Sequence, residues 1–210
     1  LNMHEPAVVA ALLDVARFWL DRGVDGFRLD AIDCAAHDPQ LRDNPVRPVE
    51  ERVPGGLVEM NPTARQLQLF NKGRPETLTL LLEPLRRLCD GYDDVVLLGE
   101  IAGDRALENA VVYSGGGRGI HMAYTFDLLA ADYTPASFGT VIDRLETTIA
   151  DGWPCWSFSN HDVVRAPTRL GGIHPPESLR RQLPILLACL RGSVCLYQGE
   201  ELGLDEAELA

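Results

Sequence analysis

Apolar residues recur at helical spacing in five stretches of this 210-residue chain. The first stretch, residues 6–22, begins with Pro6, which suits the first turn of a helix, and stops before Gly23. One face of this predicted helix comprises Val8, Leu12, Val15, Ala16 and Trp19. The other four helices are expected over residues 76–89, 105–113, 138–150 and 177–190.

Short apolar runs lie between these helices and predict strands. They cover residues 27–30, 95–98, 121–129, 154–162 and 193–197. Because helix and strand alternate along the chain, we expect an α/β fold with a mostly parallel sheet and the helices outside it. Such sheets bind ligands at the carboxyl ends of their strands.

Two segments break the alternation. Residues 34–74 are rich in proline and poor in periodic apolar positions, which predicts a long loop of a kind that is usually functional. The glycine run at 114–119 resembles a dinucleotide-binding fingerprint, but Ile120 stands where its last glycine should be. The run also precedes a strand rather than following one, so we interpret it as a helix-to-strand turn.

Composition excludes several classes of function. A net charge of −12 disfavours binding to nucleic acid or to an acidic membrane surface. No apolar run approaches the roughly 18 residues of a membrane span. The five cysteines contain no CxxC pair, which favours reduced thiols in a cytoplasmic protein over disulfides or a zinc site.

Candidate chemistry begins in the strand at 27–30. Arg28 and Asp30 are two residues apart and therefore point to the same side of the strand. A neighbouring cation holds a carboxylate ionised and oriented, which suits a nucleophile. A purely structural ion pair at a strand edge is the alternative, and these residues alone do not decide between the two.

Two further carboxylates, Glu100 and Asp162, also follow predicted strands. If the fold brings them to Asp30, three carboxylates converge together with Arg28, His161 and Arg165. Glycosidic cleavage needs two carboxyl groups in different protonation states. Glu100 follows an apolar strand and suits the proton donor, whereas Asp30 suits the nucleophile. We expect their carboxyl groups roughly 5–5.5 Å apart, the spacing of retaining enzymes.

Three segments resemble, in order, the signature segments of the α-amylase superfamily, glycoside hydrolase family thirteen. They are residues 26–30 (GFRLD), 99–101 (GEI) and 158–162 (FSNHD), and residues 192–201 resemble the last barrel strand of that family. Residues 37–45 and 200–204 are similar to bacterial exo-acting α-glucosidases of the maltase and oligo-1,6-glucosidase type.

The resemblance implies a (β/α)8 TIM barrel, of which residues 1–210 would form a partial catalytic domain. This part would hold about five of the eight βα units, from the fourth strand to the eighth. The first three strands, the lid subdomain and the all-β C-terminal domain of the family would be absent. We therefore expect little activity from the segment on its own.

The resemblance also implies roles for single residues. Asp30 would be the nucleophile and Glu100 the general acid/base, while Asp162 would hold sugar hydroxyls and stabilise the transition state. Arg28 and His161 would line the first sugar subsite, with Arg165 beside it. Ala31 would border the acceptor site, where family members that prefer α-1,6 bonds carry Val.

The implied activity is that of a retaining α-glucosidase acting on short, maltose-like α-1,4 glucosides, with no cofactor and no metal. An oligo-1,6-glucosidase or a glucosyl-transfer enzyme of the same family is the alternative. A magnesium enzyme of the enolase type would need a lysine base, but Lys72, the only lysine, lies in the long loop. A non-catalytic relative would be expected to have lost the carboxylates.

The remaining polar and aromatic candidates have simpler interpretations. His4, His37 and His174 lack partners at metal-ligand spacing and suit loop positions. Trp153 and Trp156 flank a strand and are expected to pack rather than to stack on sugars. The five acidic residues at 200–208 predict a solvated surface.

Overall fold

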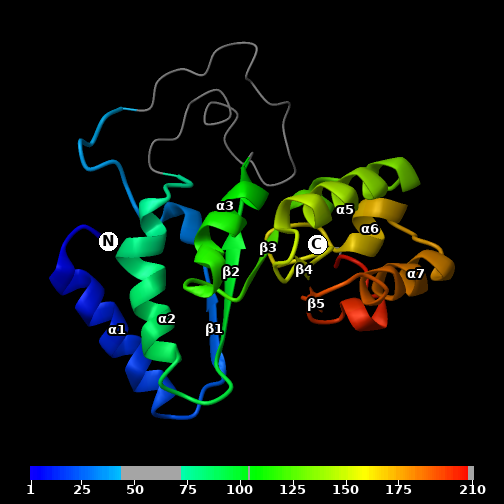
Figure 1. The fold of residues 1–210 in the computed structure, drawn as a ribbon. Coiled ribbons are helices and arrows are strands. Elements are labelled where there is room, and N and C mark those ends of the chain that lie inside the picture. Colours follow the sequence, from blue (N-terminus) through cyan, green and yellow to red (C-terminus); the bar gives the residue numbers. More distant parts are fainter. Residues whose placement is uncertain (44–71, 104, 208–210) are drawn as a thin grey trace. The chain divides into compact units, whose positions relative to one another are not determined.

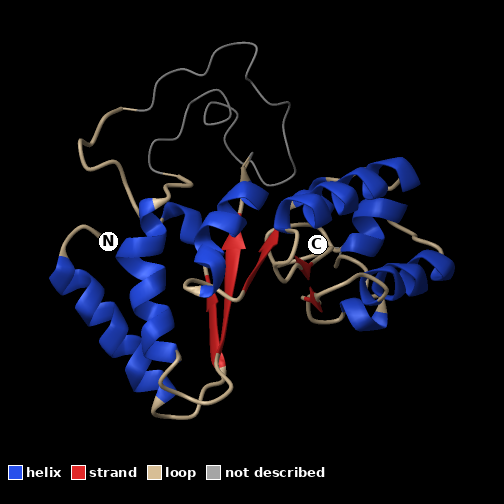
Figure 2. Ribbon diagram, in the orientation of Figure 1, coloured by secondary structure: helices blue, strands red, loops and turns tan. Residues whose placement is uncertain are grey.

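The computed structural model describes residues 1–43, 72–103 and 105–207. These residues form two compact units, which meet in the chain between Ala123 and Tyr124. Most of the predicted long loop lies outside the described residues. Figures 1 and 2 show both units, and each is described here by itself.

The first unit contains two parallel strands covered by helices (Figure 1). Its elements are α1 (Pro6–Leu20), β1 (Gly26–Leu29), η1 (Ile32–Cys34), η4 (Leu78–Leu82), α2 (Glu83–Cys89), β2 (Val96–Ile101), α3 (Ala106–Ser114) and η5 (Gly115–Gly117). The strand pairing runs from Gly26 opposite Val96 to Leu29 opposite Gly99. A side chain at Gly26 would place its Cβ 2.0 Å from the Val96 carbonyl oxygen, so only glycine fits where this pairing begins.

The second unit contains three parallel strands and four helices of its own. Its elements are β3 (Met122–Thr125), which begins in the first unit, α4 (Asp127–Ala130), α5 (Pro135–Ile149), β4 (Cys155–Trp156), α6 (Ala166–Gly171), α7 (Glu177–Ala188), β5 (Ser193–Val194) and η6 (Glu200–Leu202). Tyr124 pairs with Cys155, and Cys155 pairs with Ser193. The predicted alternation of helices with parallel strands is confirmed in both units.

The apolar face of α1 differs from the prediction. Val15 and Trp19 are 56% and 48% exposed, whereas Ala16 and Leu20 are buried and Leu13 packs against the core. Apolar residues occupy most of the circumference of this helix, so their period alone does not select the inward stripe. Packing of α1 against α2 selects it (Figure 1).

Three predicted strands are too long. β3 ends at Thr125, and residues 127–130 form a helical turn, while β5 ends at Val194. β4 ends at Trp156, so Asp162 lies six residues beyond the strand rather than at its end. Here polar side chains bond to the local backbone: Ser157 Oγ donates to the Ser159 carbonyl, and Asn160 Oδ1 accepts from Asp162 N–H. Such bonds compete with ladder pairing and end the strand.

Other local predictions are confirmed or extended. The glycine run forms the turn between α3 and β3, with Gly119 N–H donating to the Ser114 carbonyl at 2.9 Å. The helix predicted over 76–89 is present, but its first turns are π-helical over Leu78–Leu82. The short helix α6 was not predicted. Within the described residues, no helix combines the length and the apolar character that a membrane crossing requires.

Candidate active site

Arg28 joins two of the predicted catalytic carboxylates in the first unit. Its Nη2 lies 2.8 Å from Glu100 Oε2, and its Nη1 contacts Asp30 Oδ1. The strand register explains this meeting, because Leu29 lies opposite Gly99 and the next step brings Asp30 level with Glu100. Side chains that are 70 positions apart in the sequence therefore share one guanidinium.

The two carboxylates have different environments. The Glu100 side chain is 6% exposed, because it stands within β2 rather than after it. The Asp30 side chain is 77% exposed, and that of Arg28 is 34% exposed. One carboxyl group is thus shielded by the fold, while the other is open to solvent or to a ligand.

A sharp turn follows Asp30 and supplies a further contact to Glu100. Ala31 has a left-handed backbone, with φ 40° and ψ 47°, which is uncommon for a residue with a side chain. Its N–H donates to Glu100 Oε2 at 3.1 Å. Glu100 Oε2 therefore accepts from the Arg28 guanidinium and from the backbone beside Asp30. Ala31, which was predicted to border the acceptor site, therefore also contacts the Glu100 carboxylate through its backbone.

Asp33 was not among the predicted site residues, yet it is buried only two residues after Ala31. Its Oδ2 lies 3.5 Å from Lys72 Nζ and accepts from Ala102 N–H at 3.3 Å. Burial raises the pKa of Asp33, and the Lys72 ammonium and the Ala102 N–H oppose that effect. The only sequence signal was that Lys72 is the sole lysine of the chain. The sequence does not indicate which of the 31 acidic residues pairs with Lys72.

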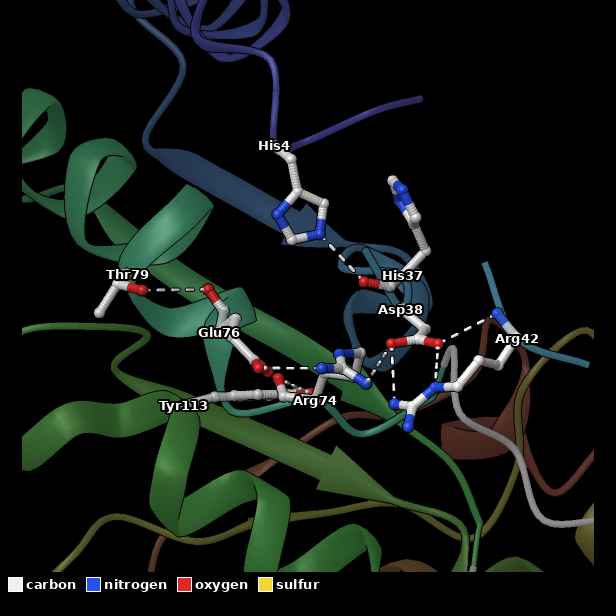
Figure 3. Close-up of polar contacts among 8 residues, drawn as sticks. All are labelled: His4, His37, Asp38, Arg42, Arg74, Glu76, Thr79 and Tyr113. Atoms are coloured by element: carbon white, nitrogen blue, oxygen red, sulfur yellow. Dashed lines mark hydrogen bonds and ion pairs between the residues drawn. The ribbon is translucent and has the colours of Figure 1, made fainter. Parts of the chain in front are cut away.

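A polar network joins the two ends of the long loop (Figure 3). Buried Asp38 receives hydrogen bonds from Arg42 Nε at 2.7 Å and Nη2 at 3.0 Å, and Arg74 Nη1 lies 3.8 Å away. Arg42 holds the pKa of Asp38 well below its usual range. His4 Nε2 hydrogen-bonds the His37 carbonyl at 3.0 Å. In the part of the chain that the structure describes, no group of side chains is arranged to ligate a metal. Both histidines lie outside the helices and strands, as predicted.

The second unit carries the remaining predicted site residues. Asp162 Oδ1 lies 3.6 Å from His161 Nε2, and both side chains are well exposed. Arg165 Nη1 donates to the Gln198 carbonyl at 2.7 Å, and its guanidinium lies 4.6 Å from the centre of the Tyr197 ring. Arg165 therefore holds the segment after β5. The approach of these three residues to Asp30 and Glu100 stays a prediction.

The predicted solvated surface at 200–208 is wrong for its first member. Glu200 is 3% exposed and accepts from Tyr197 N–H at 2.9 Å. Burial raises the pKa of Glu200, against the opposing effects of that N–H and of Arg169. Asp205 is half-buried and lies 2.7 Å from Arg180 Nη2. These carboxylates tie the end of the described chain to the helices of the second unit.

Of the two tryptophans that were expected to pack, Trp156 does so and Trp153 does not. Trp156 is buried and donates from Nε1 to the Arg191 carbonyl at 2.7 Å. Trp153 is half-exposed, and its Nε1 donates to Ser193 Oγ at 2.8 Å. This bond joins the chain just before β4 to the first residue of β5. All five cysteines lie in described segments and are present as thiols.

Comparison with known proteins gives concordant matches. The family profile described as "Alpha amylase, catalytic domain" matches residues 1–210. A probable alpha-glucosidase of Rhizobium meliloti (strain 1021) is 45% identical over all of this chain, which covers 38% of that protein. An oligo-1,6-glucosidase of Parageobacillus thermoglucosidasius is 28% identical over 97% of this chain, which covers 36% of it.

A solved structure supports the same relationship. The crystal structure of an alpha-glucosyl transfer enzyme, XgtA, has 51% sequence identity to this chain and superimposes with a TM-score of 0.91. The match covers all of this chain and 39% of the XgtA chain. The chain thus spans less than two-fifths of the length of these relatives. Its parallel strands and helices have the α/β fold of part of their (β/α)8 barrel. Matched along its whole length by the family profile, the chain belongs to the alpha-amylase catalytic-domain family.

Proposed function

We propose that this chain supplies the nucleophile and the acid/base of a retaining, exo-acting α-glucosidase that cleaves short α-1,4-linked glucosides such as maltose. The observation that carries the proposal is the single guanidinium of Arg28 in contact with two carboxylates of unequal burial. Retaining glycosidases need one carboxylate as nucleophile and one carboxyl group as proton donor. Residues 1–210 would provide strands four to eight of the catalytic barrel.

The difference in burial supports the proposed roles of Asp30 and Glu100. Arg28 touches both carboxylates, so the cation by itself does not distinguish them. Burial disfavours the charged form of a carboxyl group, so shielded Glu100 suits the group that carries the proton. Exposed Asp30 can reach the sugar and suits the nucleophile.

The reaction would proceed in two displacements. The Asp30 carboxylate bonds to C1 of the terminal glucose while the C1–O bond to the leaving sugar breaks, and Glu100 gives its proton to that oxygen. Glu100 then takes a proton from a water molecule. The water oxygen bonds to C1 as the ester bond to Asp30 breaks. Each step inverts C1, so the released glucose keeps the α configuration.

The second unit would contribute the remaining contacts to the substrate. Asp162 would accept hydrogen bonds from sugar hydroxyls and stabilise the transition state, with His161 beside it. Arg165 would act from the edge of this subsite, since its guanidinium is engaged with Tyr197 and Gln198. These contacts support a role for Arg165 in holding the subsite rather than in binding the sugar directly.

Glucosyl transfer is the second candidate, because XgtA, at 51% identity, is named for that reaction. Both reactions share the glucosyl-enzyme intermediate and differ only in whether water or a sugar hydroxyl attacks it. Product analysis at increasing maltose concentration distinguishes them. A transferase forms one trisaccharide for each glucose that it releases from maltose, whereas hydrolysis releases two glucose molecules per maltose and forms no trisaccharide.

The test of the proposed function is the anomer that is released first. The protein expressed from its complete gene is mixed with 4-nitrophenyl α-glucoside, and the anomeric protons of the product are followed by NMR. We expect α-glucose to appear before mutarotation produces the β anomer. Initial release of β-glucose would contradict a retaining mechanism, and no release of glucose or transfer product would contradict the proposed activity.

Ala31 is proposed to favour α-1,4 over α-1,6 bonds, because its methyl group leaves room beside the scissile oxygen. We expect Ala31→Val to shift the ratio of kcat/KM for maltose and isomaltose toward isomaltose by about tenfold, within the 1–3 kcal/mol that small differences of fit provide. The measurement is kcat/KM on both disaccharides.

Ala31→Thr is a second variant of nearly the same volume and shape as Val. Both replacements are β-branched and meet the same left-handed backbone, so stability falls in either variant. Backbone strain that disturbs the bond to Glu100 lowers both rates alike and leaves their ratio unchanged. Crowding beside the scissile oxygen predicts a similar shift of the ratio in both variants, and no shift in the Val variant would place specificity elsewhere.

A further inference from the structure

Asp33 connects three segments of the first unit that are distant in the sequence. Its backbone carbonyl accepts from Gly73 N–H at 2.7 Å, and its carboxylate lies between the Lys72 ammonium and Ala102 N–H. The side chain is 1% exposed. Both ends of the long loop and the end of β2 therefore meet at one buried carboxylate.

The bond from Ala102 has a counterpart that runs in the opposite direction. Ala31 N–H, from the chain after β1, donates to the Glu100 carboxylate on β2. Ala102 N–H, from the chain after β2, donates to the Asp33 carboxylate beyond β1. The last register pair of the two strands is Leu29 with Gly99, so these two bonds continue the connection past the ladder. The two bonds therefore hold residues 100–102 against the chain that follows β1.

Packing around this link leaves little freedom for it to rearrange. A Cβ on Gly99 would lie 2.6 Å from Ile32 Cδ1, so η1 rests directly on β2 at the residue before Glu100. A Cβ on Gly103 would lie 3.6 Å from Lys72 Cε and Nζ, so the lysine covers the residue after Ala102. Buried polar groups bonded on all sides define a geometry, whereas loss of one partner leaves the other unsatisfied.

We propose that Asp33 is a positioning residue for the acid/base Glu100: its carboxylate fixes the backbone at Ala102 and thereby holds the Glu100 carboxyl group where it can transfer a proton to the leaving-group oxygen. The inference rests on the proposed function. Asp33 itself touches no reacting atom. Its effect on the formation of the glucosyl-enzyme is confined to the protonation of the leaving group, which distinguishes it from a residue that merely keeps the enzyme folded.

This distinction provides a test with two substrates. Maltose has a poor leaving group that requires the proton from Glu100, whereas 4-nitrophenolate leaves without one. We expect Asp33→Ala to lower kcat/KM for maltose, which reports formation of the glucosyl-enzyme, about 10- to 100-fold, because a misplaced catalytic group costs that order of magnitude. We expect kcat/KM for 4-nitrophenyl α-glucoside, which reports the same step, to fall less than about threefold. The ratio of the two rates does not depend on the fraction of enzyme that is folded.

Two further variants complete the experiment. Asp33→Asn keeps an acceptor for Ala102 N–H and should restore at least about tenfold of the selective loss in Asp33→Ala. Asp38→Ala removes another buried carboxylate of the same segment, which bonds Arg42 rather than the end of β2, and should affect both substrates equally.

The outcomes are distinct. Equal losses on both substrates in Asp33→Ala would overturn the positioning role, as would a selective loss in Asp33→Asn as large as that in the alanine variant. A wild-type protein that cleaves neither substrate would overturn the proposed function instead.

Discussion

Replacing Asp30 with glycine should lower kcat/KM for maltose by about 10⁴-fold or more, because removal of a nucleophile eliminates the covalent step altogether. Glu100→Ala should cost about 10²–10⁴-fold on maltose, the usual contribution of a general acid and base. Both variants remove carboxylates that contact Arg28, so loss of activity alone would not tell the two roles apart.

Azide separates the roles. In Asp30→Gly, azide can occupy the space of the missing carboxylate and bond to C1 as the leaving group departs, so one inversion produces β-glucosyl azide. In Glu100→Ala, Asp30 still forms the glucosyl ester, and azide displaces it without needing a general base. Two inversions then produce α-glucosyl azide. We expect these opposite anomers with 4-nitrophenyl α-glucoside as the donor, identified by NMR.

The exposed carboxylate Asp14, which pairs with Arg17 on α1, serves as the control. Asp14→Asn should retain full activity and should form no glucosyl azide. If the two anomers appear with the variants exchanged, Glu100 is the nucleophile and Asp30 the acid. If neither variant forms an azide product and both retain activity, the catalytic pair lies elsewhere in the protein.

Arg28→Ala should lower kcat/KM by about 10²–10³-fold. The guanidinium contacts Asp30 through one nitrogen and Glu100 through another, so its removal leaves two neighbouring carboxylates without their shared cation. Part of the cost is orientation, because a catalytic group that is misplaced by about 1 Å loses about 10²-fold. Arg28→Lys should recover little, since a single ammonium lacks the planar fork that spans both partners.

Added guanidinium tests this explanation directly. Millimolar guanidinium chloride should restore part of the activity of Arg28→Ala, and the same concentration of sodium chloride should not. Arg22→Ala is the matched control, because Arg22 precedes the same strand but donates to the Phe18 carbonyl and lies over the Phe18 ring. Its activity should be unchanged. Full activity of Arg28→Lys would mean that only the positive charge matters.

Local sequence determined much of this architecture. Pro6 begins the first helix and Gly23 lies in the turn that follows it. The glycine run makes the turn before β3, and the alternation at 27–30 brings Arg28 and Asp30 to the same side of the chain. These features depend on backbone preferences and on side-chain spacing over a few residues, which are present in the chain before it folds.

The end of β4 shows where local inference was incomplete. An apolar run predicted strand as far as Asp162, but Ser157 and Asn160 bond to the neighbouring backbone and the ladder stops at Trp156. The same polar residues could have predicted a turn. Whether the backbone after Trp156 bonds to these side chains or pairs with a neighbouring strand depends on the partners that the fold of the second unit provides.

Only the tertiary structure decided the contacts that complete the candidate site. Arg28 reaches Glu100 because β1 and β2 pair in a register that brings Asp30 level with it. Ala31 N–H donates to Glu100 in β2, and the Asp33 carboxylate accepts from Ala102 N–H just after β2, so each partner is 69 positions away. These bonds stabilise the left-handed turn at Ala31 and the buried position of Asp33. Sequence spacing contains no information about such partners, because parallel pairing across an intervening helix sets which residues meet.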